Sequence, residues 1–428
     1  MHRSAFCVVL TVILAASGAS AQAAQPDQTG LIKQLIQRID KLEGEVTELK
    51  SALADATSRP EPISKPAPAS DEYDGMQGML GDHDVTNDVA DPHDERHYPS
   101  LHFRGFADVD FAATDQKGAK SGFNMGQFIL HAASPLSEHI TYFGEFSFTA
   151  QPGNYTLDLE RSLVRYDVND FFKLSFGRYH TPINYWNTAY HHGLWLQTSI
   201  SRPEMIRFGG RFQPVHFLGF LAEGNIPSGK LGLGYNAGLG NGRGATISRP
   251  GDSGDVNNNR AWLASLFARP AILHRFQIGG SVYRDEVSPA GIPGNPVLGE
   301  WISTAHVAWT QETPEFIAEF AHVRHRNVLT QVPYNSRSAY AQVAYRLPWN
   351  HRRWKPYYRF EFSNIALNDP LFISTDPTVA IKDLTGSTVG VRFDISSFAA
   401  FKWEYRNTQR GHGDPPVNGI FAQTSFTF

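Results

Sequence analysis

Apolar and polar residues alternate along the chain from Leu101 onward, and a period of two predicts β-strands. The first such segment, LHFRGFADVDF, places Leu101 and Phe103 on one face and Arg104 and Asp108 on the other. The same pattern recurs in ITYFGEFSF, RSAYAQVAYRL, KPYYRFEF and GSTVGVRFDI. One face of each strand is apolar and aromatic, whereas the other carries charges and amides. The pattern therefore predicts an all-β domain over residues 100–428.

Such strands can form a soluble sandwich, or a membrane barrel that turns its apolar face outward to lipid. The predicted strands are about ten residues long, which suffices to cross a bilayer when tilted. Tight connections such as VND and SSF alternate with long ones at 241–258, 287–298 and 366–384, and aromatic residues gather near strand ends, as in an interfacial girdle. We therefore predict a transmembrane antiparallel β-barrel surrounded by outer-membrane lipid.

Counting the alternating segments gives about 16 strands. An even number of antiparallel strands places the N-terminal and C-terminal ends of the barrel chain on the same side, the periplasm. An additional strand in MIRFGGRFQ would give about 18 instead. A barrel this wide leaves an aqueous channel, because side chains cannot fill it. The predicted strands begin near residues 101, 122, 140, 155, 172, 216, 231, 259, 274, 299, 315, 337, 355, 385, 400 and 418.

The N-terminal residues 1–23 have the features of a secretory signal peptide: a short basic start, an apolar run too short to span a bilayer, and small-residue cleavage sites. The single cysteine, Cys7, lies within it, so the mature chain has no thiol for metal binding or catalysis. The formal net charge of −4 indicates no nucleic-acid partner.

Residues 31–53 carry a heptad pattern that predicts a short periplasmic coiled coil. Its a and d positions are Ile32, Ile39 and Val46, and Leu35, Leu42 and Leu49, respectively. β-branched a positions with leucine at d favour a dimer. However, RIDKLE resembles the trimerisation signature of parallel coiled coils, in which Arg38 faces Glu43 of a neighbour, and the wide apolar stripe also favours a homotrimer.

Residues 54–99 are rich in Pro, Ala, Asp and Gly without periodicity, which is typical of a flexible linker. His83, His93 and His97 lie there among many aspartates. A divalent-cation site is conceivable in this composition, but nothing fixes ligand geometry, so a solvated acidic linker is the favoured interpretation.

The stretch GRYHTPINYWNTAYHHGLWLQTSISRP, 177–203, holds three histidines and two tryptophans. It contains no carboxylate, and adjacent side chains on a strand point apart, so we predict no metal site. It has no Gly-x-Ser-x-Gly turn to expose a nucleophile, so we predict no catalytic residue, no cofactor and no enzymatic activity. The segment 181–215, which follows the fifth predicted strand, is the longest unpaired one, and long loops are usually functional.

Two motifs, FKLSFGRYHTPINYW and LGYNAGLGNGRG, resemble strand-and-loop motifs of the phosphate-selective porin O/P group. A coiled coil before the barrel is similar to the stalked sugar- and dicarboxylate-type porins. The terminus IFAQTSFTF resembles the strand signature that the barrel-assembly machinery recognises, here through Phe428. The resemblance implies a trimeric, sixteen-stranded Gram-negative porin with a constriction loop after strand five. Its phosphate-specific members have lysine clusters, which the barrel of this chain lacks.

Two sets of side chains are candidates for the pore. The constriction and solute-binding candidates are Arg178, His180, Tyr185, His191, His192, Arg202, Arg207 and Arg211. The lumen-wall candidates are Arg104, Asp108, Arg161, Arg165, Arg359 and Arg406. In a narrow site such arginines can replace part of the hydration of an anion. The alternative interpretation of each is that it only hydrates the lumen wall.

The sequence thus predicts an outer-membrane porin for passive diffusion of small hydrophilic solutes, with a lean towards anions. Two alternatives stay open at this stage. One is a structural tether with a plugged barrel, in which the stalk grips a periplasmic partner. The other is an outer-membrane barrel hydrolase, which needs a His/Ser pair on the lipid-facing wall.

Overall fold

The computed structural model describes residues 98–207, 212–290, 294, 296–373 and 381–428, together with six residues near the N-terminus. Those six are Lys33, Gln37, Arg38, Lys41, Gly44 and Thr47, and all are helical and exposed. The signal peptide, the linker up to residue 97 and the predicted coiled-coil core residues lie outside the described residues. The coiled coil and its oligomeric state therefore stay predictions. No helix in the described ranges is long and apolar enough to cross a membrane.

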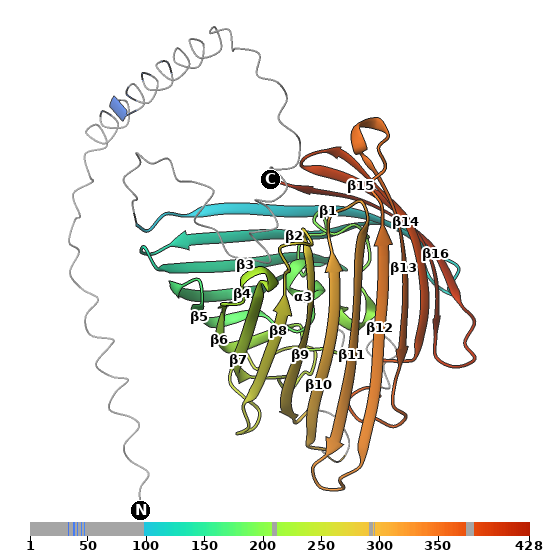
Figure 1. Ribbon diagram of the computed structural model, residues 1–428. Helices are drawn as coiled ribbons and strands as arrows, with labels where there is room; N and C mark the ends of the chain where they lie inside the picture. The colour runs from blue at the N-terminus through green and yellow to red at the C-terminus, as the bar shows by residue number, and fades with distance from the viewer. Residues whose placement is uncertain are drawn as a thin grey trace, which may run out of the picture. The chain divides into compact units, whose positions relative to one another are not determined.

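Sixteen antiparallel strands form one closed barrel, in which each strand pairs with its sequence neighbours and β1 pairs with β16 (Figure 1). The strands are β1 His102–Thr114, β2 Gly122–Pro135, β3 Ile140–Gln151, β4 Asn154–Asn169, β5 Phe172–His180, β6 His216–Ile226, β7 Leu233–Asn241, β8 Ala261–Ala268, β9 Phe276–Val287, β10 Leu298–Trp309, β11 Glu315–Asn327, β12 Pro333–Ala344, β13 Trp354–Asn364, β14 Leu384–Ser396, β15 Ala399–Arg410 and β16 Val417–Thr427.

The predicted count of about 16 strands is confirmed, and the alternative of 18 is wrong. The barrel closes with these sixteen, and the segment proposed as an extra strand begins instead with a short 3₁₀ helix, η1 Glu204–Ile206, followed by Arg207 in extended backbone outside any sheet. At the seam, the Gly105 N–H donates to the Phe428 carbonyl (2.9 Å) and the Phe428 N–H donates to the Gly105 carbonyl (3.1 Å). The seam leaves neither terminal strand with an unpaired edge.

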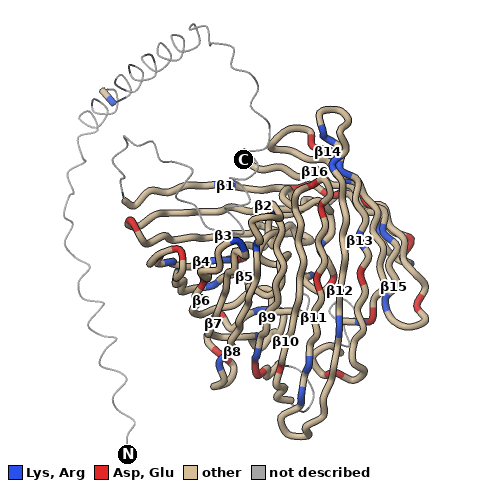
Figure 2. The backbone as a smooth tube through the Cα atoms, viewed as in Figure 1, with Lys and Arg blue, Asp and Glu red and all other residues tan. Residues whose placement is uncertain are grey.

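The two faces of the strands are as different as the alternation predicts. On β13, Tyr358 and Phe360 are 41% and 40% exposed on the outside, whereas Lys355 and Arg359, at positions of the opposite parity, are buried inside. Charged positions are spread along the tube of β12 to β15 in Figure 2, and on β13 and β15 the buried ones, Lys355, Arg359, Lys402 and Glu404, belong to the inward face. This inside-out pattern is that of a barrel facing lipid.

The connections at the two ends of the barrel differ in length. At one end the chain turns within two residues at 170–171 and at 397–398. At the other end, long connections run through 181–215, 242–260 and 365–383. This alternation confirms the prediction, and the longest connection, 181–215, also holds the short helix α3 Trp186–Ala189 (Figure 1).

Candidate functional site

The connection 181–215, here called the inserted segment, folds into the barrel. Several of its apolar side chains are almost fully buried: Ile183 and Ile206 are 1% exposed and Trp186 is 0% exposed. They pack against inward-facing rings of the wall, and the Trp186 ring meets that of Tyr340 edge-on, with centroids 5.9 Å apart. The segment therefore narrows the barrel from within, as the resemblance implied for the connection after strand five.

Buried carboxylates of the wall hold the segment through its backbone amides. Glu319 on β11 accepts hydrogen bonds from the N–H groups of Tyr185 (2.7 Å) and Trp186 (2.6 Å) at the start of α3, which have no partner within the helix. Glu404 on β15 accepts one from the Ile200 N–H (2.6 Å). Hydrogen bonds to a charged acceptor are about twice as strong as neutral ones.

Buried cations of the same wall hold the segment through its carbonyls. Arg359 Nη1 on β13 donates to the Ser201 carbonyl (2.8 Å), and Arg392 Nη1 on β14 donates to that of Trp195 (2.6 Å). Lys402 Nζ on β15 donates to the carbonyls of Ser199 and Leu194. We call Glu319, Arg359, Arg392, Lys402 and Glu404 the pinning wall. These charged side chains form hydrogen bonds with the inserted segment and do not line an open channel.

The predicted lumen-wall residues pair mostly with near neighbours. Arg161 binds Glu145 on the adjacent strand β3. Arg165 pairs with Asp167 (2.7 Å), and Arg406 pairs with Glu404, each two residues apart on one strand. Asp108 is buried and accepts a hydrogen bond from the Gln127 N–H (3.2 Å), and Arg104 is half-buried. Of the six, Arg359 binds the inserted segment, through the Ser199 hydroxyl and the Ser201 carbonyl.

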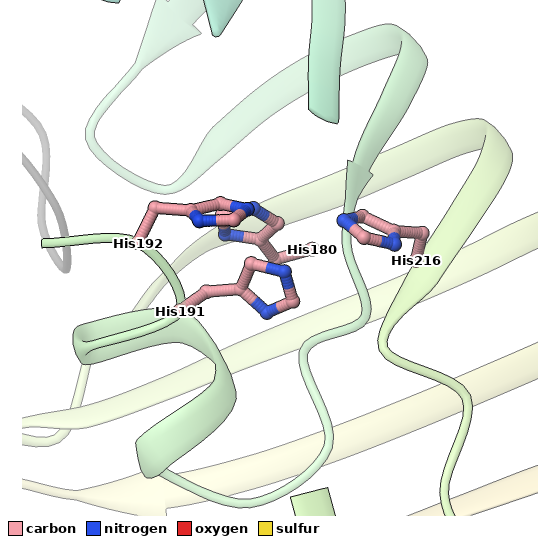
Figure 3. Close-up of side chains that lie close together, drawn as sticks. All are labelled: His180, His191, His192 and His216. Atoms are coloured by element: carbon pink, nitrogen blue, oxygen red, sulfur yellow. The ribbon is translucent and has the colours of Figure 1, made fainter. Parts of the chain in front are cut away.

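Four histidines meet on the opposite side of the inserted segment. His180 ends β5 and His216 begins β6, and the two are paired in register. His191 and His192 follow α3 in the segment, and their rings turn towards the other two (Figure 3). One ring nitrogen from each of the four lies within 4.8 Å of the others, and all four side chains are buried. We call this group the histidine cluster.

Polar groups of β3, β4 and α3 surround the cluster. Glu160 lies 2.9 Å from His216 Nε2 and 3.3 Å from His192 Nε2. Glu145 lies 3.4 Å from His180 Nε2. The Nδ1 of His191 is 2.8 Å from Asn187 Oδ1. Burial lowers the pKa of His191 well below its usual range, so that ring is neutral at pH 7.

The predicted constriction residues are thus only partly brought together. His180, His191 and His192 meet, and Arg202 lies beside them, with Nη2 donating to the His191 carbonyl (2.9 Å). Burial lowers the pKa of Arg202 to about 9, which leaves it charged at pH 7.

The other four constriction candidates lie elsewhere or are not described. Arg178 is buried and faces Asp252 of the connection 242–260, with Nε and Oδ1 3.5 Å apart. Arg207 pairs with Glu204 (3.4 Å), Tyr185 lines the cavity described below, and Arg211 lies outside the described residues.

Sequence reasoning missed His216 as a member of the cluster. A signal for it was available, because strands that flank one connection pair antiparallel, so the last residue of β5 must lie opposite the first of β6. The objection to a metal, that adjacent histidines on a strand point apart, does not apply here, since His191 and His192 lie outside any strand. The carboxylates missing from the segment come from β3 and β4.

A cavity of about 570 Å³ lies between the inserted segment and the short turns of the barrel. The segment contributes Tyr185, Thr188 and Tyr190 to it, and the turns contribute Asp170 and residues 270–271 and 273–275. Its cationic lining residues are Arg161, Arg165, Lys173, Arg269 and Arg275, and its acidic ones are Asp170 and Glu223. Cations therefore outnumber carboxylates in the lining by five to two.

Comparison with known proteins agrees with this architecture. No family model matches the chain, and no curated protein matches it. The fold is similar to the anion-selective porin from Comamonas acidovorans, with a TM-score of 0.56 and 9% identity over 77% of this chain and 100% of that one.

Two further solved structures are similar at the same level. The outer membrane channel DcaP of Acinetobacter baumannii has a TM-score of 0.52 and 14% identity over 77% of this chain and 97% of that one. The trimer form of OmpT of Vibrio cholerae has a TM-score of 0.52 and 12% identity over 77% of this chain and 99% of that one. At these identities the likeness establishes a sixteen-stranded, porin-like barrel.

Proposed function

We propose that this protein is an outer-membrane porin that passes small hydrophilic solutes by passive diffusion. The observation that carries the proposal is the inserted segment, which narrows a sixteen-stranded barrel while a cavity of about 570 Å³ persists beside it. A barrel wall that is apolar outside and polar inside needs lipid around it and water within it. The likeness to outer-membrane porins and channels supports the same function.

We further propose that the channel favours anions. Five cations against two carboxylates line the cavity, and a low-dielectric wall concentrates the resulting positive field. One of the similar structures is named an anion-selective porin, which supports the same direction. The resemblance of two motifs to the phosphate-selective group points to oxyanions as solutes, although the cavity lining contains a single lysine, Lys173.

Planar-bilayer recording of the purified full chain tests both proposals. We expect stepwise ion conductance, and a reversal potential in a KCl gradient that indicates anion preference. A folded protein that inserts but gives no conductance would contradict the porin and favour a tether with a plugged barrel, which the dense hydrogen bonding of the pinning wall also suits. Conductance with cation preference would retain the porin and exclude the anion lean.

For the N-terminal part we propose a cleaved signal peptide over residues 1–23 and a periplasmic, homotrimeric coiled coil over 31–53, with Phe428 recognised by the barrel-assembly machinery at the other terminus. The heptad pattern supports the coiled coil. Ile39→Asp should abolish self-association of a peptide covering 31–53, measured by sedimentation. An unchanged sedimentation profile would contradict it. Deleting 31–53 should leave the conductance of the barrel unchanged if the protein is a porin. If it is a tether instead, the same deletion should abolish binding to the periplasmic partner.

A further inference from the structure

The histidine cluster has a composition that the proposed channel does not require. Its four imidazoles come from three separate places in the chain: the end of β5, the inserted segment and the start of β6. They are buried to between 2% and 8% exposure, and one nitrogen of each converges on a common centre. We propose that His180, His191, His192 and His216 bind one divalent transition-metal ion of the zinc and copper class.

The spacing of the ligand atoms suits such an ion after small side-chain rotations. In a tetrahedral site with bonds of about 2.0 Å, the four nitrogens lie about 3.3 Å apart. The nitrogens of the cluster lie within 4.8 Å of one another, so each pair has to close by about 1.5 Å or less. His180 and His216 keep a fixed distance through strand pairing, while His191 and His192 lie on irregular backbone that can adjust.

The surroundings supply the outer partners that metal-bound histidines usually have. Such a histidine binds the ion through one nitrogen and donates the other N–H to a carboxylate, an amide or a carbonyl. Glu160 stands in this position for His216 and His192, Glu145 for His180, and Asn187 for His191. The Nδ1 of His180 has no hydrogen-bond partner in the described part of the chain.

Charge balance also allows a cation at this place. Glu160 is 7% exposed and lies 2.9 Å from His216 Nε2 and 3.3 Å from His192 Nε2, so its carboxylate compensates part of the charge of a divalent ion. Glu145 contributes less, because it also binds Arg161. Four nitrogen ligands select a borderline transition metal over Mg²⁺ or Ca²⁺, which prefer oxygen.

Metal binding at this cluster would cross-link the inserted segment to the barrel wall. An ion held by these four residues would join the middle of the segment to both strands from which it emerges. Because all four ligands are buried and His180 alone among them lines the cavity, the ion would reside there and fix the segment, instead of passing through the channel.

Metal analysis of the full chain tests the proposal. The protein should carry a histidine-free tag, and His83, His93 and His97 of the linker should be replaced by alanine in the reference variant, so that the linker cannot bind metal. After stripping with EDTA and incubation with Zn²⁺, gel filtration and elemental analysis should give one zinc per chain. A hundredfold excess of Mg²⁺ should not displace it.

Two variants of that reference distinguish the cluster from other sites. His191→Ala combined with His192→Ala should weaken Zn²⁺ binding at least ~100-fold, because it removes two ligands, whereas losing only an outer partner already costs 10- to 100-fold. His306→Ala removes a buried histidine outside the cluster and should keep one zinc per chain. Heat-modified gel mobility shows whether each barrel is folded, and His191→Asn with His192→Gln replaces the double alanine variant if it is not.

Three results would overturn the metal site: less than about a tenth of a zinc per folded reference chain, equal zinc in the double variant, or displacement by Mg²⁺. None of these readouts depends on conductance. The metal site and the porin can therefore fail independently of each other.

Discussion

The inserted segment is attached to the barrel on two sides, by different chemistry. On the pinning wall, charged side chains bind backbone amides and carbonyls directly: Glu404 accepts the Ile200 N–H, and Arg359 donates to the Ser201 carbonyl. In the histidine cluster, by contrast, rings converge on each other, and the His180 Nδ1 has no hydrogen-bond partner among the described residues. A buried polar atom without a partner costs about 1–3 kcal/mol.

The difference teaches that one side is held by direct hydrogen bonds between charged side chains and the backbone, whereas the other gains from an added ion. Substitutions in the pinning wall should therefore lower the free energy of unfolding, and this effect should not depend on added metal. Metal binding at the histidine cluster should raise the free energy of unfolding. The following experiments test this contrast, from the largest expected effect to the smallest.

Removing one charge from the pinning wall should have the largest effect. Glu404→Ala leaves the Ile200 amide, the Tyr357 hydroxyl and Arg406 without their acceptor. Breaking a buried charged network in this way costs about 3–5 kcal/mol of unfolding free energy. Guanidinium unfolding in detergent, followed by the fluorescence of segment tryptophans, measures it. Glu223→Ala, a half-buried carboxylate of the cavity lining, is the control and should cost less than about 1 kcal/mol.

Zinc should have the next largest effect, on the histidine side. At a free concentration 100 times its Kd, an ion that binds only the folded chain adds about 2.7 kcal/mol to the free energy of unfolding. EDTA should reverse the gain. The same increment should appear in Glu404→Ala to within about 0.5 kcal/mol, because the two attachments share no residue. A zinc increment that disappears in Glu404→Ala would show that the two sides are one coupled unit.

Asn187 connects α3 to Thr181 and Val215, the first and last residues of the inserted segment. Its substitution should have a smaller effect on the free energy of unfolding. Its Nδ2 donates to the carbonyls of Thr181 (2.9 Å) and Val215 (3.0 Å), and its Oδ1 faces His191. Asn187→Ala removes both of these hydrogen bonds, each worth about 0.5–1.5 kcal/mol, and should lower the free energy of unfolding by about 1–3 kcal/mol. The two carbonyls still accept from the N–H groups of Ile183 and Thr181. It should also weaken zinc binding about 10-fold or more, through the lost outer partner of His191. Unchanged zinc affinity would argue against that partnership.

A charge change in the cavity lining should leave both attachments intact. Lys173→Glu alters a half-buried cation of β5 that faces the cavity, so stability should change by less than about 0.5 kcal/mol. The reversal potential in a KCl gradient should nevertheless move towards cation preference. Lys117→Glu makes the same charge change on the exposed turn after β1 and should not move it. Equal shifts in both variants would mean that the cavity does not set selectivity.

Much of the fold could be predicted from the sequence, because strand alternation is a local property. Predicted strand starts such as 122, 140, 172 and 315 coincide with those observed. The largest difference is β12, which begins at Pro333 rather than near 337, since PYNS lacks an apolar alternation. The extra strand at 205–213 was an error of the same kind, a short apolar pattern that the structure uses to bury Met205 and Ile206 inside the barrel.

The candidate site was less predictable, because it depends on which strands face which part of the segment. Arg359 and Glu404 were recognisable as inward-facing residues, but their binding to backbone around Ser201 is a contact between positions about 160 to 200 residues apart. Sequence patterns do not encode such pairings. His216 could have been found by pairing β5 with β6, whereas Glu145 and Glu160 required the curvature of the barrel.

The seam between β1 and β16 has a consequence for how the barrel comes into being. The Thr427 hydroxyl donates to the Gly105 carbonyl, a contact between residues 322 positions apart. Until the last strand is synthesised, β1 has an unpaired edge and the incomplete sheet exposes its apolar face. Contacts this distant form slowly, and open edges invite aggregation in the meantime. Closure of the ring by β16 therefore removes the last open edge, which makes completion of the barrel depend on its C-terminal strand.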